Sequence, residues 1–285
     1  MRRNGEKDKM RLLGIDIGGT FIKYALVSEN KVVDSGKKPS NAKFGAEKLL
    51  ETLFAVIDEF VCGFDGIAVS TAGVVGKNGE IVYANDNIPR YTGVKLKEIL
   101  KNKYGVEVSV MNDAAAMAYS LKTELNDYFF IAVGTGVAGG YVCGGKLFTG
   151  GGGFAGQLGY LTALNGKRAD TEASSKGLSE LCGKPCEEVF KDAKKGDETT
   201  LLLLKKWAKE LYNVIKAAVV FYNPETVVIG GGISAQGDFL INLVKAAADE
   251  DESPYSKSYK IICAPSENFQ AVIGAIKYFT ENCDE

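Results

Sequence analysis

The sequence predicts an α/β protein with two domains of similar construction. Three observations support this prediction: strand-like segments alternate with helix-like segments, a hairpin with a small-residue turn occurs twice, and each hairpin is followed by further strands and helices. The two turns are Gly18-Gly19-Thr20 and Gly134-Thr135-Gly136. In the first half of the chain, strands separated by helices favour an α/β unit with a largely parallel sheet. We expect a cleft between the domains, with one turn on each side of it.

The first half of the chain contains the first hairpin and the first predicted sheet. Short apolar runs indicate strands at 12–17, 21–27, 31–36, 66–70, 81–83 and 106–111. Helices are expected at 42–61 and 94–104, and the first carries Leu49, Leu53 and Ile57 at helical spacing. A small-residue helix is expected from Asn112 onward, and the polar stretch 119–127 marks the domain junction.

The second half repeats this order from residue 128. Hairpin strands are expected at 128–133, 137–142 and 146–148, followed by four glycines at 150–153 that form either a mobile rim of a pocket or a plain loop. A long helix at 199–222 carries an apolar stripe that includes Leu203, Trp207 and Leu211. The remaining elements are a strand at 226–229, a glycine turn at 230–232, a helix at 237–249, a strand at 261–264 and a closing helix at 270–281.

The composition argues against several classes of function. A net charge of −2 gives no electrostatic case for binding nucleic acid or an anionic membrane. No apolar run approaches the ~20 residues that span a bilayer. The first ten residues are charged and lack the apolar core of a secretory signal, so we expect a cytoplasmic protein.

Histidine is absent from the 285 residues. Its absence removes Ser-His-Asp and Cys-His nucleophilic systems and His-ligated metal sites, so any acid–base step must use Asp, Glu, Lys, Tyr or Cys. The six cysteines are mostly scattered, and the pair Cys182 and Cys186 alone does not make a zinc site. We expect reduced thiols and no bound zinc.

Two segments combine the end of an apolar strand with small or polar residues. Glycines in the turn after Asp16 leave backbone N–H groups open to a phosphate chain, and a carboxylate there suits Mg²⁺. The same turn is also consistent with a plain tight hairpin. At Asn112-Asp113 an apolar strand ends and a helix begins, so on the residues alone this pair is typical of a helix cap.

Four motifs in this order resemble the ROK family of sugar kinases: Asp16-Ile17-Gly18-Gly19-Thr20, Asn112-Asp113, Gly134-Thr135-Gly136 and Gly230-Gly231-Gly232. The resemblance runs from about Leu12 to the C-terminus. It implies the two-domain actin/hexokinase-like ATPase fold, which is ribonuclease H-like, with a cleft between the domains. We expect a small N-terminal α/β domain, 11–119 plus 272–285, closed by the C-terminal helix, and a larger α/β domain, 120–271.

The resemblance also implies ATP and Mg²⁺ as cofactors. Asp113 is implied as the general base toward a sugar hydroxyl, a 6-hydroxyl by analogy, and Asp16 as an indirect metal residue. The residues implied to bind the nucleotide are Asp16, Gly18, Gly19, Thr20, Lys23, Gly134, Thr135, Gly136, Gly231 and Gly232. Those implied on the sugar are Gly73, Asn112, Asp113, Gln157, Tyr160 and Asp170.

The sugar side departs from the common family pattern. Gln157 stands where that pattern has Glu, and Tyr160 stands where it has the His of the zinc-bearing members. A zinc-free subgroup that includes β-glucoside kinases also has Tyr there. Asp170 matches a later Glu; a different gap would give that role to Glu172, and we favour Asp170.

The sequence therefore predicts an ATP-dependent kinase of a hexose or a β-glucoside. N-acetylmannosamine is an alternative substrate within the same class. A sugar-binding protein that has lost catalysis is an alternative of another class, and Gln157 is the residue that favours it. Partners are expected to be a small-molecule sugar and, as is common among relatives, a second copy of the chain, with no nucleic acid and no membrane.

Overall fold

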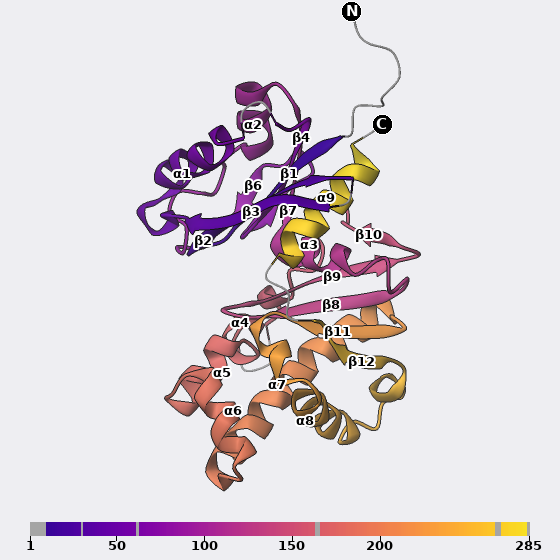
Figure 1. Cartoon of the computed structure of the whole chain (residues 1–285). Helices are drawn as coiled ribbons and strands as arrows, with labels where there is room; N and C mark the ends of the chain where they lie inside the picture. Colours follow the sequence, from indigo (N-terminus) through magenta and orange to yellow (C-terminus); the bar gives the residue numbers. More distant parts are fainter. Residues whose placement is uncertain (1–9, 30, 61–62, 163–165, 266–268, 284–285) are drawn as a thin grey trace, which may run out of the picture. The chain divides into compact units, whose positions relative to one another are not determined.

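The computed structural model describes residues 10–29, 31–60, 63–162, 166–265 and 269–283. The chain divides into two compact units (Figure 1). Unit 1 comprises Met1–Ser120, Gly150–Phe154 and Phe269–Glu285, and unit 2 comprises Leu121–Thr149 and Ala155–Asn268. Each unit contains one five-stranded sheet.

The sheet of unit 1 has the strand order β3-β2-β1-β4-β7. Its strands are β1 (Arg11–Ile17), β2 (Phe21–Ser28), β3 (Lys31–Pro39), β4 (Gly66–Thr71) and β7 (Glu107–Asn112). The pairs β1–β2 and β2–β3 are antiparallel, whereas β1–β4 and β4–β7 are parallel. The expectation of a largely parallel sheet is therefore wrong for this half, because only two or three residues separate its first three strands along the chain, and parallel pairing needs a longer crossover. A separate antiparallel ribbon is formed by β5 (Val74–Val75) and β6 (Ile81–Tyr83).

Helices cover both faces of this sheet. They are α1 (Ala46–Asp58), α2 (Leu96–Tyr104), α3 (Asp113–Ser120) and α9 (Gln270–Asn282). The helix predicted at 42–61 is interrupted at Gly45, whose φ of +102° is left-handed, so a 3₁₀ turn (Ala42–Phe44) precedes α1.

The two faces of the sheet are packed differently. Leu13 and Ile15 of β1 belong to the same buried cluster as Leu49 of α1. On the other face Gly14 lies against α9, where an added Cβ would come 2.6 Å from the Cδ1 atom of Ile276. The C-terminal helix, yellow in Figure 1, therefore lies close to β1, which carries Asp16, and to β4 and β7, the last of which ends at Asn112.

Unit 2 repeats the strand order of unit 1, as β10-β9-β8-β11-β12. The strands are β8 (Tyr128–Val133), β9 (Val137–Cys143), β10 (Lys146–Phe148), β11 (Thr226–Gly230) and β12 (Lys260–Cys263). As in unit 1, the first three strands of the unit, β8, β9 and β10, form an antiparallel meander. The later strands β11 and β12 pair in parallel, β11 with β8 and β12 with β11.

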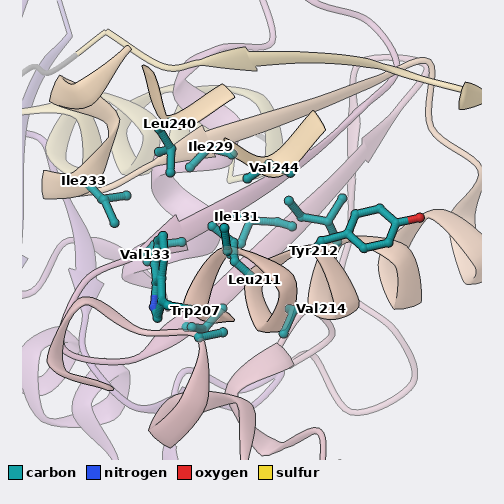
Figure 2. Packing of buried hydrophobic residues seen from close by; sticks show 14 of the residues in the cluster. Ile131, Val133, Trp207, Leu211, Tyr212, Val214, Ile229, Ile233, Leu240 and Val244 are labelled. Atoms are coloured by element: carbon teal, nitrogen blue, oxygen red, sulfur yellow. The ribbon is translucent and has the colours of Figure 1, made fainter. Parts of the chain in front are cut away.

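The core of unit 2 lies between this sheet and two helices, α7 (Glu198–Tyr222) and α8 (Asp238–Asp249). Figure 2 shows Trp207 and Leu211 of α7 beside Ile131 and Val133 of β8. Three short helices precede α7 and were not predicted from the sequence: α4 (Ala169–Glu172), α5 (Ser175–Cys182) and α6 (Cys186–Lys194). Within the described residues, no helix combines the length and apolar character needed to cross a bilayer.

Candidate active site

Ser40, a residue that no sequence motif marks, fixes the first glycine turn. The Gly18 N–H donates to Phe21 O at 3.0 Å and closes the turn. The fully buried Ser40 donates its Oγ–H to Gly19 O and its N–H to Thr20 O, both at 2.9 Å. The N–H groups of Gly19 and Thr20 have no hydrogen-bond partner in the part of the chain that the structure describes. The turn thus presents two open donors, the arrangement that suits a phosphate.

Asp16 lies one residue before the end of β1, between two neighbours in the sheet. Ser70 of β4 donates its Oγ–H to Asp16 Oδ1 at 2.6 Å, and Lys23 of β2 is the cross-strand partner. Burial raises the pKa of Asp16, while the Ser70 hydrogen bond and the Lys23 charge oppose that rise. Ser70 and Thr71 are polar residues at the end of the fully buried strand β4, and a polar residue in such a strand is a signal by which the sequence could have identified Ser70.

Asn112 ends β7 and caps α3. Its Oδ1 accepts hydrogen bonds from the N–H groups of Ala114 and Ala115, at 3.0 and 3.2 Å. Its Nδ2 donates to Gly73 O and to Asp113 Oδ1, both at 2.9 Å. Protein groups therefore take up both amide hydrogens and two acceptor positions of Asn112. In this geometry Asn112 orients Asp113 and the Gly73 loop, and its direct contact with a sugar stays a prediction.

Asp113 is the first residue of α3 and is half-buried. Oδ1 accepts from the Ala114 N–H at 2.8 Å and from Asn112 Nδ2. Both bonds fall on Oδ1, which leaves Oδ2 as the oxygen that can take a proton. Burial, followed by the nearby negative charge of Asp16, raises the pKa of Asp113 to about 7, while the two hydrogen bonds oppose the rise. The helix-cap and the catalytic interpretations are thus compatible, because Asn112 caps and Asp113 remains available.

The second glycine turn, in unit 2, is also closed by one backbone hydrogen bond, but this bond joins residues two apart in the chain rather than three. The Gly134 N–H donates to Gly136 O at 3.0 Å, and the N–H groups of Thr135 and Gly136 have no partner among the described residues. Gly231 lies beside this turn: its φ is +83°, and an added Cβ would come 2.5 Å from Val133 O. Gly232 begins the following 3₁₀ turn (Gly232–Gln236). Unit 2 thus brings the glycines of the third and fourth motifs together.

Tyr160 and Asp170, both predicted on the sugar side, are linked by Arg168. The Arg168 guanidinium lies 4.1 Å from the centre of the Tyr160 ring, and its Nη2 lies 3.3 Å from Asp170 Oδ2. Glu172 points to a different partner, Lys167, at 3.1 Å. Gln157 precedes the 3₁₀ turn Leu158–Tyr160 and is partly buried. No feature of the sequence around Arg168 marked it for this position.

Comparison with known proteins assigns the chain to a family. The model of the ROK family matches residues 12–282. This chain belongs to the ROK family. The resemblance predicted from its four motifs is therefore confirmed.

Two relatives and one solved structure illustrate what this ROK chain is similar to. An uncharacterized protein of Clostridium perfringens is 32% identical over 94% of this chain and 97% of its own length. An N-acetylmannosamine kinase of Escherichia fergusonii is 30% identical over 81% of this chain and 86% of its own. A ROK family glucokinase from Streptomyces griseus, solved in complex with glucose and AMPPNP, has a TM-score of 0.78 at 19% identity, covering 93% of this chain and 97% of that one.

These comparisons confirm the predicted two-domain actin/hexokinase-like ATPase fold. The family and its kinase-named members also support an ATP-dependent sugar kinase.

The donor set of this ROK protein fits a Mg²⁺ ion that is held mainly by nucleotide phosphates. Among the described residues, no group of three or more Asp, Glu, Cys or His side chains could hold a metal by itself. Mg²⁺ on substrate phosphates needs only one or two protein carboxylates, and Asp16 beside the first turn can supply one. The expected absence of zinc stays a prediction.

Proposed function

We propose that this ROK protein transfers the γ-phosphoryl group of ATP to a hydroxyl of a hexose, with Asp113 as the general base. The observation that carries the proposal is the state of Asp113. One of its oxygens is fixed by hydrogen bonds, the other is left for a proton, and its pKa is about 7. A carboxylate with that pKa accepts a proton from a hydroxyl more readily than one with an ordinary pKa, while remaining partly ionised at neutral pH.

The two glycine turns support the nucleotide half of the proposal. Each turn closes with one hydrogen bond and leaves two N–H donors open, as expected of a backbone site for phosphate oxygens. Mg²⁺, when bound with ATP, would neutralise charge on the phosphates, and Asp16 is the residue that we propose to hold it indirectly. Ser70 keeps the Asp16 carboxylate in place.

The acceptor is proposed as a hexose phosphorylated on its 6-hydroxyl. Relatives named for N-acetylmannosamine and for glucose support this class of substrate without deciding between its members. Glucose, N-acetylmannosamine and the β-glucoside cellobiose therefore form the first assay panel.

The test compares Asp113→Asn with the wild type on that panel, with ADP release as the readout. We expect kcat to fall about 10²–10⁴-fold, because Asn cannot accept the proton, while Mg-ADP binding changes little. Asp86→Asn, an exposed carboxylate in the same unit, is the matched control and should retain wild-type kcat. Near-normal turnover by Asp113→Asn would overturn the proposed role.

Gln157 is the observation that favours a second candidate, a sugar-binding protein without catalysis. A neutral amide brings no charge to a position where the common family pattern has a carboxylate. If no sugar on the panel supports ADP release while several raise the Tm of the wild type, the binding function replaces the kinase.

A further inference from the structure

The carboxylate of Asp170 is bonded to the second glycine turn. Its Oδ1 accepts a hydrogen bond from the Val137 N–H at 2.8 Å, and Val137 is the first residue after the turn. Its Oδ2 faces Arg168 Nη2 at 3.3 Å. Both oxygens therefore have protein partners, and one partner belongs to the backbone of the turn that we propose to bind phosphate.

Two glycines provide the space that this carboxylate occupies. An added Cβ on Gly136 would come 2.8 Å from Asp170 Oδ1, and one on Gly159 would come 2.0 Å from the same atom and 2.6 Å from Val137 O. Neither glycine has a positive φ, so the backbone conformation does not require glycine at these positions. What glycine supplies at both positions is room for Asp170 beside the turn.

The segment that carries Asp170 holds the turn at a second point. The Ser175 N–H donates to Gly134 O at 2.9 Å. Ser174 is fully buried, caps α5 by accepting from the Gly177 N–H, and accepts the Trp207 Nε1–H on its own carbonyl oxygen at 3.0 Å. The turn is thus fixed at its first residue by Ser175 and just after its last residue by Asp170, and the core helix α7 anchors the segment that carries both.

Arg168 explains how a carboxylate can stand beside a phosphate-binding turn. An unpaired negative charge there would oppose the binding of an anion. The guanidinium of Arg168 lies against Asp170 Oδ2 and stacks on Tyr160, so it offsets that charge in place.

We propose that Asp170 is a positioning residue for the second glycine turn and acts on nucleotide affinity rather than as a ligand of the sugar. This inference rests on the proposed function, because it takes the turn at Gly134–Gly136 to bind phosphate. Loss of the carboxylate leaves the Val137 N–H without its acceptor, so the turn is held less firmly. The open N–H donors of the turn then bind the nucleotide phosphates more weakly.

The experiment measures Kd for Mg-ADP and for each sugar by calorimetry, together with KM for ATP and for the sugar. Asp170→Ala is expected to weaken Mg-ADP binding and raise KM for ATP about tenfold, the size of a lost hydrogen bond to a charged acceptor, with KM for the sugar within about twofold. Asp170→Asn retains an acceptor oxygen for Val137 and should restore nucleotide affinity to within about threefold of the wild type. Glu180→Ala, an exposed carboxylate on α5, is the matched control.

The outcomes separate this inference from the proposed function. If Asp170→Ala raises KM and Kd for the sugar while nucleotide affinity is unchanged, Asp170 is a sugar ligand and the inference is wrong, although the kinase stands. If Asp170→Asn is as impaired as Asp170→Ala in nucleotide binding, the hydrogen bond to Val137 is not what matters, and the inference also fails. If the wild type binds no Mg-ADP, both the proposed function and this inference are wrong. Circular dichroism and Tm of each variant confirm that it is folded.

Discussion

Replacing Asp113 with Asn should stabilise the fold while it removes activity. The pKa of this carboxyl is about 7 in the folded chain against 3.8 as its ordinary value, so folding disfavours the ionised form. A one-unit change in pKa corresponds to about 1.4 kcal/mol. At high pH the ionised Asp113 therefore lowers the free energy of unfolding by at most roughly 4 kcal/mol. Because the side chain is only half-buried, solvent screens part of this cost. We expect the free energy of unfolding of Asp113→Asn to exceed that of the wild type by ~1–3 kcal/mol.

The sign of the pH dependence follows from the raised pKa. The stability associated with the protonated carboxyl is fully present below about pH 4 and is lost as pH rises through about 7. Asn does not ionise, so the variant escapes this loss. The free energy of unfolding of the variant, relative to the wild type, should therefore increase from pH 4.5 to pH 8 and then level off.

Urea unfolding followed by circular dichroism at pH 4.5 and pH 8 measures this difference. Asp197→Ala is a control of opposite sign: the Thr200 hydrogen bonds lower the pKa of Asp197, so its stabilising cap is present above about pH 4 and lost only below it. That variant should be less stable than the wild type by a similar amount at both pH values. An equal stability difference for Asp113→Asn at pH 4.5 and pH 8 would refute the reasoning.

Two further substitutions test the turns. Ser40→Ala removes the hydroxyl bonded to Gly19 O, so we expect KM for ATP to rise several-fold and stability to fall by ~1–2 kcal/mol; ATP titrations and urea unfolding measure both effects, and an unchanged KM would count against a role for this turn. Gly231→Ala places a Cβ 2.5 Å from Val133 O at a φ of +83°, so we expect a loss of ~2–3 kcal/mol. A Tm equal to that of the wild type would contradict the tight packing of this glycine.

The hairpins and their candidate residues could be predicted because their signals are local. Gly18-Gly19-Thr20 and Gly134-Thr135-Gly136 lie between apolar runs, and the end of the strand at Asn112 is readable from the change in pattern. Ser40 could not be found in this way, because it reaches a turn 21 residues earlier in the chain. Arg168 likewise matters only through two side chains that the fold brings to it.

The errors of the fold prediction have physical causes. The helix expected at 42–61 carries the right apolar spacing, yet Gly45 adopts a left-handed φ that interrupts it. The helices α4, α5 and α6 are short and rich in polar residues, and burial against α7 stabilises them more than local propensity does. The cytoplasmic location and the dimer stay predictions.

The two sheets have the same strand order but differ in the residue that precedes the end of the strand leading into each glycine turn. Asp16 precedes the last residue of β1, and Ala132 occupies the corresponding place in β8. The backbone plan is thus duplicated, whereas an acid on the strand before the turn occurs in one copy only. An acid at residue 132 would add a further negative charge next to a turn suited to anions. Only the first sheet therefore carries a carboxylate on the strand that leads into its turn, whereas the carboxylate beside the second turn, Asp170, is paired with Arg168.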